Sequence, residues 1–101
     1  MTPEQIALKA YREKNAALAA ICDAAGEPLY EKRGFCPADG CKPSVIRRAR
    51  VYMAKDERVL VEELEVRQFF RRRSHSSTIR EATGIPDGQS IADAFIESPY
   101  L

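Results

Sequence analysis

Residues 44–73 read SVIRRARVYMAKDERVLVEELEVRQFFRRR, and the conformation of this segment determines whether the protein is mainly helical or contains a sheet. The segment begins at Ser44, a residue type that often caps the N-terminus of a helix. Ile46, Ala49 and Met53 then fall on one helical face, while the arginines between them fall mostly on the outside. This pattern favours a helix from Ser44.

The second half of the segment fits either a helix or a strand. Its apolar residues fit a helix that ends near Arg73 better than a strand, because strict alternation fails at Glu62 and Glu63. These apolar residues are Leu60, Leu64, Val66, Phe69 and Phe70. Runs this short cannot be decided by periodicity alone. A β-hairpin that pairs residues 50–53 with 58–62 is therefore the alternative.

The N-terminal part carries clear helix signals. Thr2 is a good N-cap, Pro3 suits the first helical position, and Gln5 completes a capping box. Alanines favour helix strongly and are frequent up to Gly26, where glycine is expected to end the helix. We therefore expect an alanine-rich helix over residues 3–25.

The remaining segments are predicted from their turn residues. Residues 26–43 hold three glycines and three prolines, so we expect an irregular loop. The last third predicts two short helices, the first running through Ile79 to Thr83 and the second capped by Asp87. In the second helix Ile91, Ala94 and Phe95 are expected to point inward. The predicted fold is mainly α, in one domain over residues 1–101.

Composition narrows the class of protein. The chain has 101 residues, of which 45% are hydrophobic and 31% charged, as is typical of a globular domain rather than a disordered one. No window reaches the roughly 18 uninterrupted apolar residues of a membrane span. The first residues, MTPEQ, lack the basic flank and apolar stretch of a secretory signal. We expect a cytoplasmic protein that does not contact membranes.

The net charge of +1 conceals an uneven distribution. Residues 1–43 balance to zero, residues 44–83 carry ten basic and six acidic side chains, and residues 84–101 carry three acids and no lysine or arginine. Nine of the ten basic residues in the middle block are arginines, which suit bidentate contact with phosphate or carboxylate. The clusters Arg47–Arg48 and Arg71–Arg73 have no acid within their own turn. A solvated helix face would also carry such arginines, but a basic stripe for nucleic acid is the sharper interpretation.

Catalysis and metal binding find little support. Cys36 and Cys41 form one close pair, whereas Cys22 and the single His75 lack any recognisable zinc spacing. We expect free thiols, with a Cys36–Cys41 disulfide or a metal site as less favoured alternatives. The chain has no nucleophile elbow and no glycine-rich phosphate loop. We therefore expect no enzymatic activity and no cofactor.

Two segments resemble DNA-binding folds. Residues 77–96, STIREATGIPDGQSIADAFI, resemble the core of a helix-turn-helix module, with residues 59–73 as the preceding scaffold helix. The resemblance implies a helix-turn-helix-like region over residues 59–98, in which Gln89 and Ser90 could read base edges.

Residues 43–53, PSVIRRARVYM, resemble the recognition helix of a winged-helix regulator, and residues 59–66 would then form the wing. This resemblance implies contacts from Arg47, Arg48 and Arg50 to phosphates and guanines.

The leading hypothesis is a small DNA-binding transcriptional regulator, encoded by a phage or mobile element and acting on double-stranded DNA. The expected nucleic-acid-binding residues are Arg47, Arg48, Arg50, Arg71, Arg72, Arg73, Arg80, Gln89 and Ser90. Such regulators usually dimerise, and the alanine-rich helix is the expected interface. The alternative is an inhibitor or adaptor that binds a partner protein through its arginines or its acidic C-terminal helix. Acids interleaved with the arginine clusters would favour this alternative.

Overall fold

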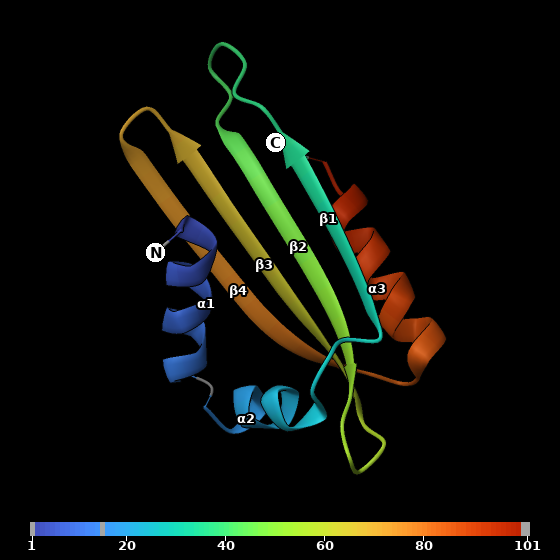
Figure 1. Ribbon diagram of the computed structural model, residues 1–101. Coiled ribbons are helices and arrows are strands. Elements are labelled where there is room, and N and C mark those ends of the chain that lie inside the picture. Colours follow the sequence, from blue (N-terminus) through green and yellow to red (C-terminus); the bar gives the residue numbers. More distant parts are fainter. Residues whose placement is uncertain (1, 15, 100–101) are drawn as a thin grey trace.

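A four-stranded antiparallel sheet forms the centre of the protein (Figure 1). The computed structural model describes residues 2–14 and 16–99. The strands lie side by side in chain order and are β1 (Tyr30–Cys36), β2 (Ser44–Met53), β3 (Val59–Phe69) and β4 (Arg72–Ala82). The helices are α1 (Pro3–Lys14) and α2 (Ala16–Ala25) before the sheet and α3 (Ile85–Glu97) after it.

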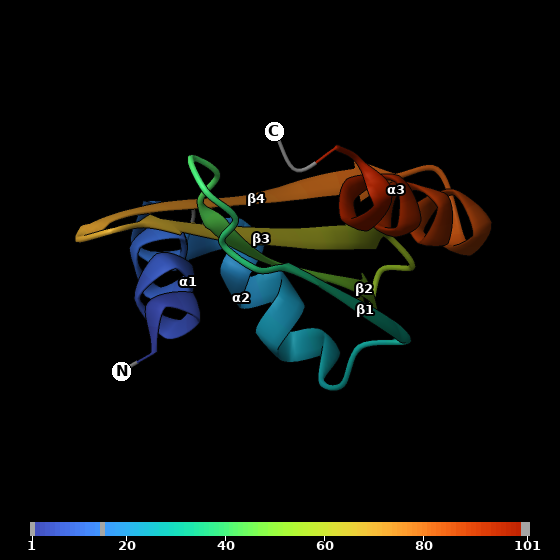
Figure 2. The ribbon, with the colours of Figure 1, turned by 90° about the horizontal axis from the view of Figure 1, so that it is seen from above.

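The helices cover both faces of the sheet. Figure 2 shows α1 and α2 on one face and α3 on the other. α1 contacts β3 and β4, α2 contacts β2, and α3 contacts all four strands. The two middle strands are therefore enclosed from both sides over much of their length.

The expected mainly α fold is wrong, because the protein is a mixed α/β structure. The predicted helices from Ser44 and over residues 59–73 are the strands β2 and β3. The physical reason is burial on both faces, which removes the alternation by which a half-exposed strand is recognised. Charged side chains take part in this burial: Arg47 is 3% exposed and Glu62 is 1% exposed.

The β-hairpin alternative describes this region correctly. Arg50 pairs with Glu62 and Met53 pairs with Val59, and the ladder then continues to Ser44. The pairing is longer than the expected 50–53 with 58–62, because both strands extend well beyond the turn.

The other segment boundaries also need correction. The region 26–43, expected to be irregular, contains β1. The predicted helix through Ile79 to Thr83 is part of β4, so residues 59–98 form two strands and one helix rather than a helix-turn-helix module. The winged-helix arrangement is not formed by these residues either, because the segment expected to be its recognition helix is the strand β2. The helix expected over residues 3–25 is present as two helices, α1 and α2.

Of two local predictions at the helix ends, one is confirmed and one is wrong. The Thr2 amide donates to Gln5 Oε1 (2.8 Å) and the Gln5 amide donates to Thr2 Oγ1 (3.2 Å), which is the expected capping box. Asp87 does not cap the last helix, because α3 already begins at Ile85 and Asp87 lies in its first turn, where it accepts a hydrogen bond from the Thr83 amide (2.9 Å). Ala94, expected to point inward, is exposed.

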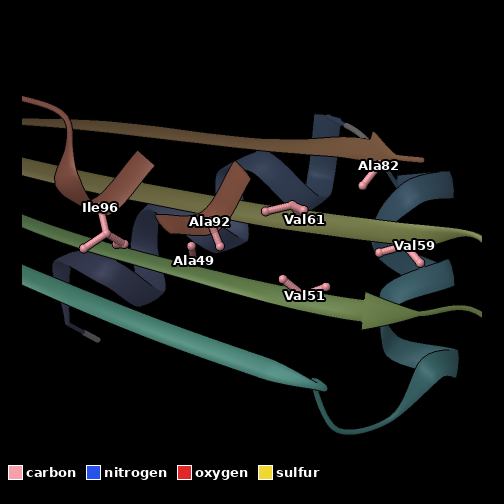
Figure 3. Close-up of a cluster of buried hydrophobic side chains, with 7 residues drawn as sticks. All are labelled: Ala49, Val51, Val59, Val61, Ala82, Ala92 and Ile96. Atoms are coloured by element: carbon pink, nitrogen blue, oxygen red, sulfur yellow. The ribbon is translucent and has the colours of Figure 1, made fainter. Parts of the chain in front are cut away.

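The main apolar core lies between the sheet and α3 (Figure 3). Its fully buried members are Ala49, Val51, Val59, Val61, Ala82, Ala92 and Ile96. A second apolar cluster lies between the sheet and α2 and includes Cys22, Tyr52 and Leu60. Burial raises the pKa of the Cys22 thiol to about 11, and the nearby Glu62 carboxylate adds to this shift. Cys22 is therefore a neutral core residue.

α3 approaches the sheet closely at Gly88. A Cβ atom at this position would lie 3.0 Å from Cγ1 of Val51 and 3.0 Å from Cγ1 of Val59. Gly88→Leu is therefore expected to lower the free energy of unfolding by about 1–3 kcal/mol, because overpacking forces the helix away from the sheet. Urea unfolding measures this change. Ala94→Leu adds a similar volume on the exposed side of α3 and should change stability by less than about 0.5 kcal/mol; equal losses would contradict the close approach.

Candidate functional site

The turn between β3 and β4 carries a group of exposed arginines. Phe69 pairs with Arg72 across the hairpin, so Phe70 and Arg71 alone form the turn. We refer to residues 67–74, which comprise this turn and the adjoining strand ends, as the hairpin end. The loop between β1 and β2 lies at the same end of the sheet (Figure 1).

Phe70 projects from the hairpin end into solvent. Phe70 is 81% exposed. Among the described residues, its ring contacts only one other aromatic ring, that of Phe69, with a centroid distance of 4.4 Å and an interplanar angle of 62°. The backbone of Phe70 has φ 54°, in the left-handed region that bulky residues rarely adopt. Such a conformation costs on the order of 1 kcal/mol or more, and it is typical of binding and switch regions. The turn therefore holds an apolar ring away from the core at an energetic cost.

Arg71, Arg72 and Arg73 follow Phe70 directly in the chain and add three positive charges to the hairpin end. All three are exposed, and none forms an ion pair with the described part of the chain. Arg72 and Arg73 are successive residues of a strand, so their side chains point to opposite faces of the sheet. The positive charge is thus available from both faces and from the tip.

Aromatic and basic side chains together line an open depression at the hairpin end. Its volume is about 520 Å³, and its lining residues are Pro43, Arg67, Phe69, Arg72, Arg73 and Ser74. A second depression lies beside it and is lined by Phe69, Phe70, Arg71 and Arg72. Both are shallow surfaces that suit an extended ligand better than an enclosed small molecule.

The acid next to the hairpin end is already neutralised. Glu65 accepts hydrogen bonds from Nε of Arg47 (2.7 Å) and Nε of Arg67 (2.8 Å). Burial by itself would raise the pKa of Glu65, but these two guanidinium groups outweigh it and the pKa is lowered. Glu65 remains ionised at neutral pH and is matched by two positive charges, so it does not reduce the positive potential of the turn.

Arg47, one of the expected DNA contacts, is a structural residue. It is 3% exposed, and its Nη1 atom donates to the carbonyl oxygens of Phe95 (3.1 Å) and Ser98 (2.7 Å) at the end of α3. The guanidinium also donates to the carbonyl of Pro99 (3.1 Å). The last carbonyls of a helix lack partners within the helix. Arg47 donates to one of them, that of Phe95, and to the carbonyls of the two residues that follow α3.

The other arginines of the first cluster and Arg80 are engaged as well. Arg48 is 8% exposed, which leaves it out of reach of a large ligand. Arg50 forms an ion pair with Glu31 on β1 (2.5 Å). Arg80 forms an ion pair with the buried Glu63 (2.6 Å). Acids therefore interleave with these arginines, and only the second expected cluster is available as free positive charge.

Gln89 and Ser90, the expected base-reading residues, are exposed on α3. They lie in the first half of α3, near the opposite end of the sheet from the hairpin end (Figure 1). The structure therefore does not bring them together with Arg71–Arg73. Acids of α3 form contacts within the protein: Asp93 accepts a hydrogen bond from the Tyr30 hydroxyl (2.6 Å) and lies 3.4 Å from Nζ of Lys32.

Sequence reasoning missed the aromatic part of the site. Phe69 and Phe70 were assigned to the apolar face of a helix, but one lines the surface depressions and the other is exposed. The signal in the sequence is the run Phe69–Arg73, where two aromatic residues directly precede three arginines. A buried helix face would not be interrupted in this way, because three successive arginines cover most of a helical turn.

The cysteines and the surface give no sign of a metal centre. Cys22, Cys36 and Cys41 are free thiols. In the described ranges, no group of three or more potential metal ligands comes together. Every helix among the described residues is too short or too polar to cross a membrane.

The fold and the hairpin end define a small α/β protein with a basic, aromatic surface at one end of its sheet. Comparison of the chain with protein-family models, curated proteins and solved structures finds no match.

Proposed function

We propose that this protein binds double-stranded DNA through the hairpin end and acts as a non-enzymatic regulator. The observation that carries this proposal is the presence of three successive exposed arginines without acidic partners in the described chain, next to the exposed ring of Phe70. Arginine forms bidentate hydrogen bonds with phosphate oxygens, and release of counterions from DNA makes such contacts favourable.

The shape of the hairpin end also suits a duplex. The major groove of B-DNA admits a two-stranded β-ribbon, and an aromatic side chain there can contact the methyl group of thymine. Phe70 at the tip has the exposure that such a contact needs. Ser74 and Ser76 are exposed on one face of β4, and their hydroxyls could donate to the phosphates that flank the groove. This mode of binding replaces the recognition helix that the sequence predicted.

We further propose that the protein is cytoplasmic and that a phage or mobile element encodes it. A chain of 101 residues has room for one modest core, and a regulator acts by occupying its site rather than by catalysis. Arg71–Arg73 would provide affinity, and Phe70 would provide the contact that depends on base sequence.

Two observations favour a second candidate function. Acids interleave with the first arginine cluster and with Arg80, which is the arrangement expected of a protein-binding module. Phe35 on β1 is 64% exposed, so a second large apolar side chain is available in addition to Phe70. An acidic protein partner could cover apolar side chains and pair with the arginines. This candidate corresponds to an inhibitor or adaptor.

The experiment that tests the proposal is fluorescence anisotropy with a labelled duplex of random sequence, titrated at several salt concentrations. We expect log Kobs to fall linearly with log[salt], with a slope of about −2.7 or steeper if all three arginines contact phosphates. Absence of binding at about 20 mM salt would overturn the proposal. Competition with polyglutamate separates the two candidates: DNA binding that survives a large excess of polyglutamate supports the duplex, whereas equal competition supports the acidic protein.

A further inference from the structure

The outer edge of β4 is a long, regular strand edge without a partner in the described chain. β4 has 11 residues and pairs with β3 without interruption from Arg72 to Ala82. It contains neither proline nor a bulge, which are common means of blocking an edge strand. The opposite edge of the sheet, β1, has only seven residues. A helix packs at each edge, α3 at β1 and α1 at β4, so the two edges differ in strand length rather than in helix cover. β4 is therefore the longer edge available for pairing.

We infer that β4 pairs with β4 of a second copy of this chain, in an antiparallel dimer centred on Ser77. A two-fold axis between antiparallel strands of one continuous sheet is perpendicular to that sheet, so one residue of the strand must face its own copy. For β4 to overlap over its whole length, from Arg72 to Ala82, that residue is Ser77. This inference goes beyond DNA binding and does not depend on it.

Charge complementarity singles out this register. Centring on Ser77 places Arg73 of each copy opposite Glu81 of the other, so two ion pairs form across the interface. Both side chains are exposed and make no ion pair within the described residues. Of the two neighbouring symmetric registers, the one centred on Ser76 would place Arg72 opposite Arg80, and like charges directly opposite each other are destabilising. The one centred on Thr78 would pair only residues 74–82 of β4 and would leave Arg73 outside the pairing.

The remaining cross-strand pairs agree with the same register. Ser76 lies opposite Thr78 of the second copy on both sides of the axis, and pairs of hydroxyl residues are favourable neighbours on a sheet. His75 lies opposite Ile79, and Ser74 lies opposite Arg80, so no pair sets two like charges against each other. The register centred on Ser77 is therefore free of repulsive pairs from Arg72 to Ala82.

The dimer has a defined architecture. Two sheets join into one continuous sheet, and both α1 helices lie on the same face, one on either side of the axis. The hairpin ends point in opposite directions along the strands. Phe70, Arg71 and Arg72 stay open to ligands, whereas Arg73 pairs with Glu81 of the second copy. The interface differs from the alanine-rich helix predicted from sequence, because the backbone hydrogen bonds of β4 supply directional contacts that small side chains do not.

Charge exchange tests the register directly. Sedimentation equilibrium should give twice the 11.3 kDa mass for the unmodified chain at about 100 µM. Arg73→Glu and Glu81→Arg alone should each weaken the dimer roughly tenfold or more, because each sets like charges opposite each other twice. The double variant R73E/E81R should recover the original dimer. Glu27→Arg, at an exposed position between α2 and β1, is the matched control and should have no effect.

A cross-link provides a second test that does not depend on charge. Residues that face each other in antiparallel strands have Cα atoms about 4.5–5.5 Å apart, within the range of a disulfide. In a background with Cys36→Ser and Cys41→Ser, Ser77→Cys should give a covalent dimer on mild oxidation, and Ser74→Cys should give much less. A monomer mass for the unmodified chain, or equal cross-linking of the two variants, would overturn the inference. Neither readout involves DNA, so its failure is distinct from failure of DNA binding.

Discussion

Arg47→Met is expected to lower the free energy of unfolding by about 3–5 kcal/mol, the usual loss when one member of a buried ion pair is removed. The guanidinium is 3% exposed and joins Glu65 to the C-terminal end of α3. Its removal leaves Glu65 with fewer donors and takes the guanidinium donors from the carbonyls of Phe95, Ser98 and Pro99. Methionine fills a similar volume, so the loss reports the polar contacts rather than a cavity. Urea unfolding measures the change.

Arg50→Met is the matched control for this substitution. Arg50 lies three residues further along β2 and pairs with Glu31, but the side chain of Arg50 is 26% exposed and that of Glu31 is 31% exposed. Partly exposed ion pairs contribute only about 0–1 kcal/mol, so this variant should lose little. Arg47→Lys keeps the charge but not the forked donor geometry, so its loss in the free energy of unfolding should lie between those of Arg47→Met and Arg50→Met. Equal losses for Arg47→Met and Arg50→Met would show that Arg47 does not hold α3.

The same buried charges explain why the sheet was hard to predict. Arg47 and Glu62 lie inside the protein, so the sequence of β2 and β3 shows neither the alternation of a half-exposed strand nor the apolar run of a fully buried one. Their burial depends on partners elsewhere in the fold: Arg47 on Glu65 and α3, and Glu62 on Arg12 of α1. No local pattern encodes such pairs.

Local signals were sufficient where the local residues decide the structure. The capping box of Thr2 and Gln5 sets the start of α1, and Gly84 precedes α3. The β3–β4 turn lacked such a signal, because tight hairpins usually use Asn-Gly or Asp-Gly and this one uses Phe70 and Arg71. The strain at Phe70 is therefore imposed by the pairing of the two strands.

The candidate site was predictable in part. Charge counting identified Arg71–Arg73 without any structure, because no acid lies within their own turn. It also identified Arg47 and Arg50, whose partners on β3 and β1 are distant in sequence. Only the register of the strands separates arginines that are paired from arginines that are available for a ligand.

Simultaneous substitution of Arg71, Arg72 and Arg73 by alanine is expected to weaken duplex DNA binding by about two to three orders of magnitude at roughly 0.1 M salt. Each phosphate contact contributes about −0.9 to the slope of log Kobs against log[salt], so the slope should become less steep by about 2.7. The three side chains are exposed and unpaired within the described chain, so folding should be unchanged. Anisotropy titrations over a range of salt concentrations measure both the affinity and the slope.

A control with the same change in net charge distinguishes a site from a general attraction. Arg33, Lys55 and Arg58 are exposed or half-exposed and lie outside the hairpin end, the last two at the opposite end of the sheet in the β2–β3 turn. Their triple alanine variant loses the same charge, so long-range attraction to DNA falls equally in both proteins. Only the hairpin variant also loses direct phosphate contacts. Equal affinities and equal salt slopes for the two variants would therefore mean that DNA responds to overall charge alone, and that the hairpin end is not where it binds.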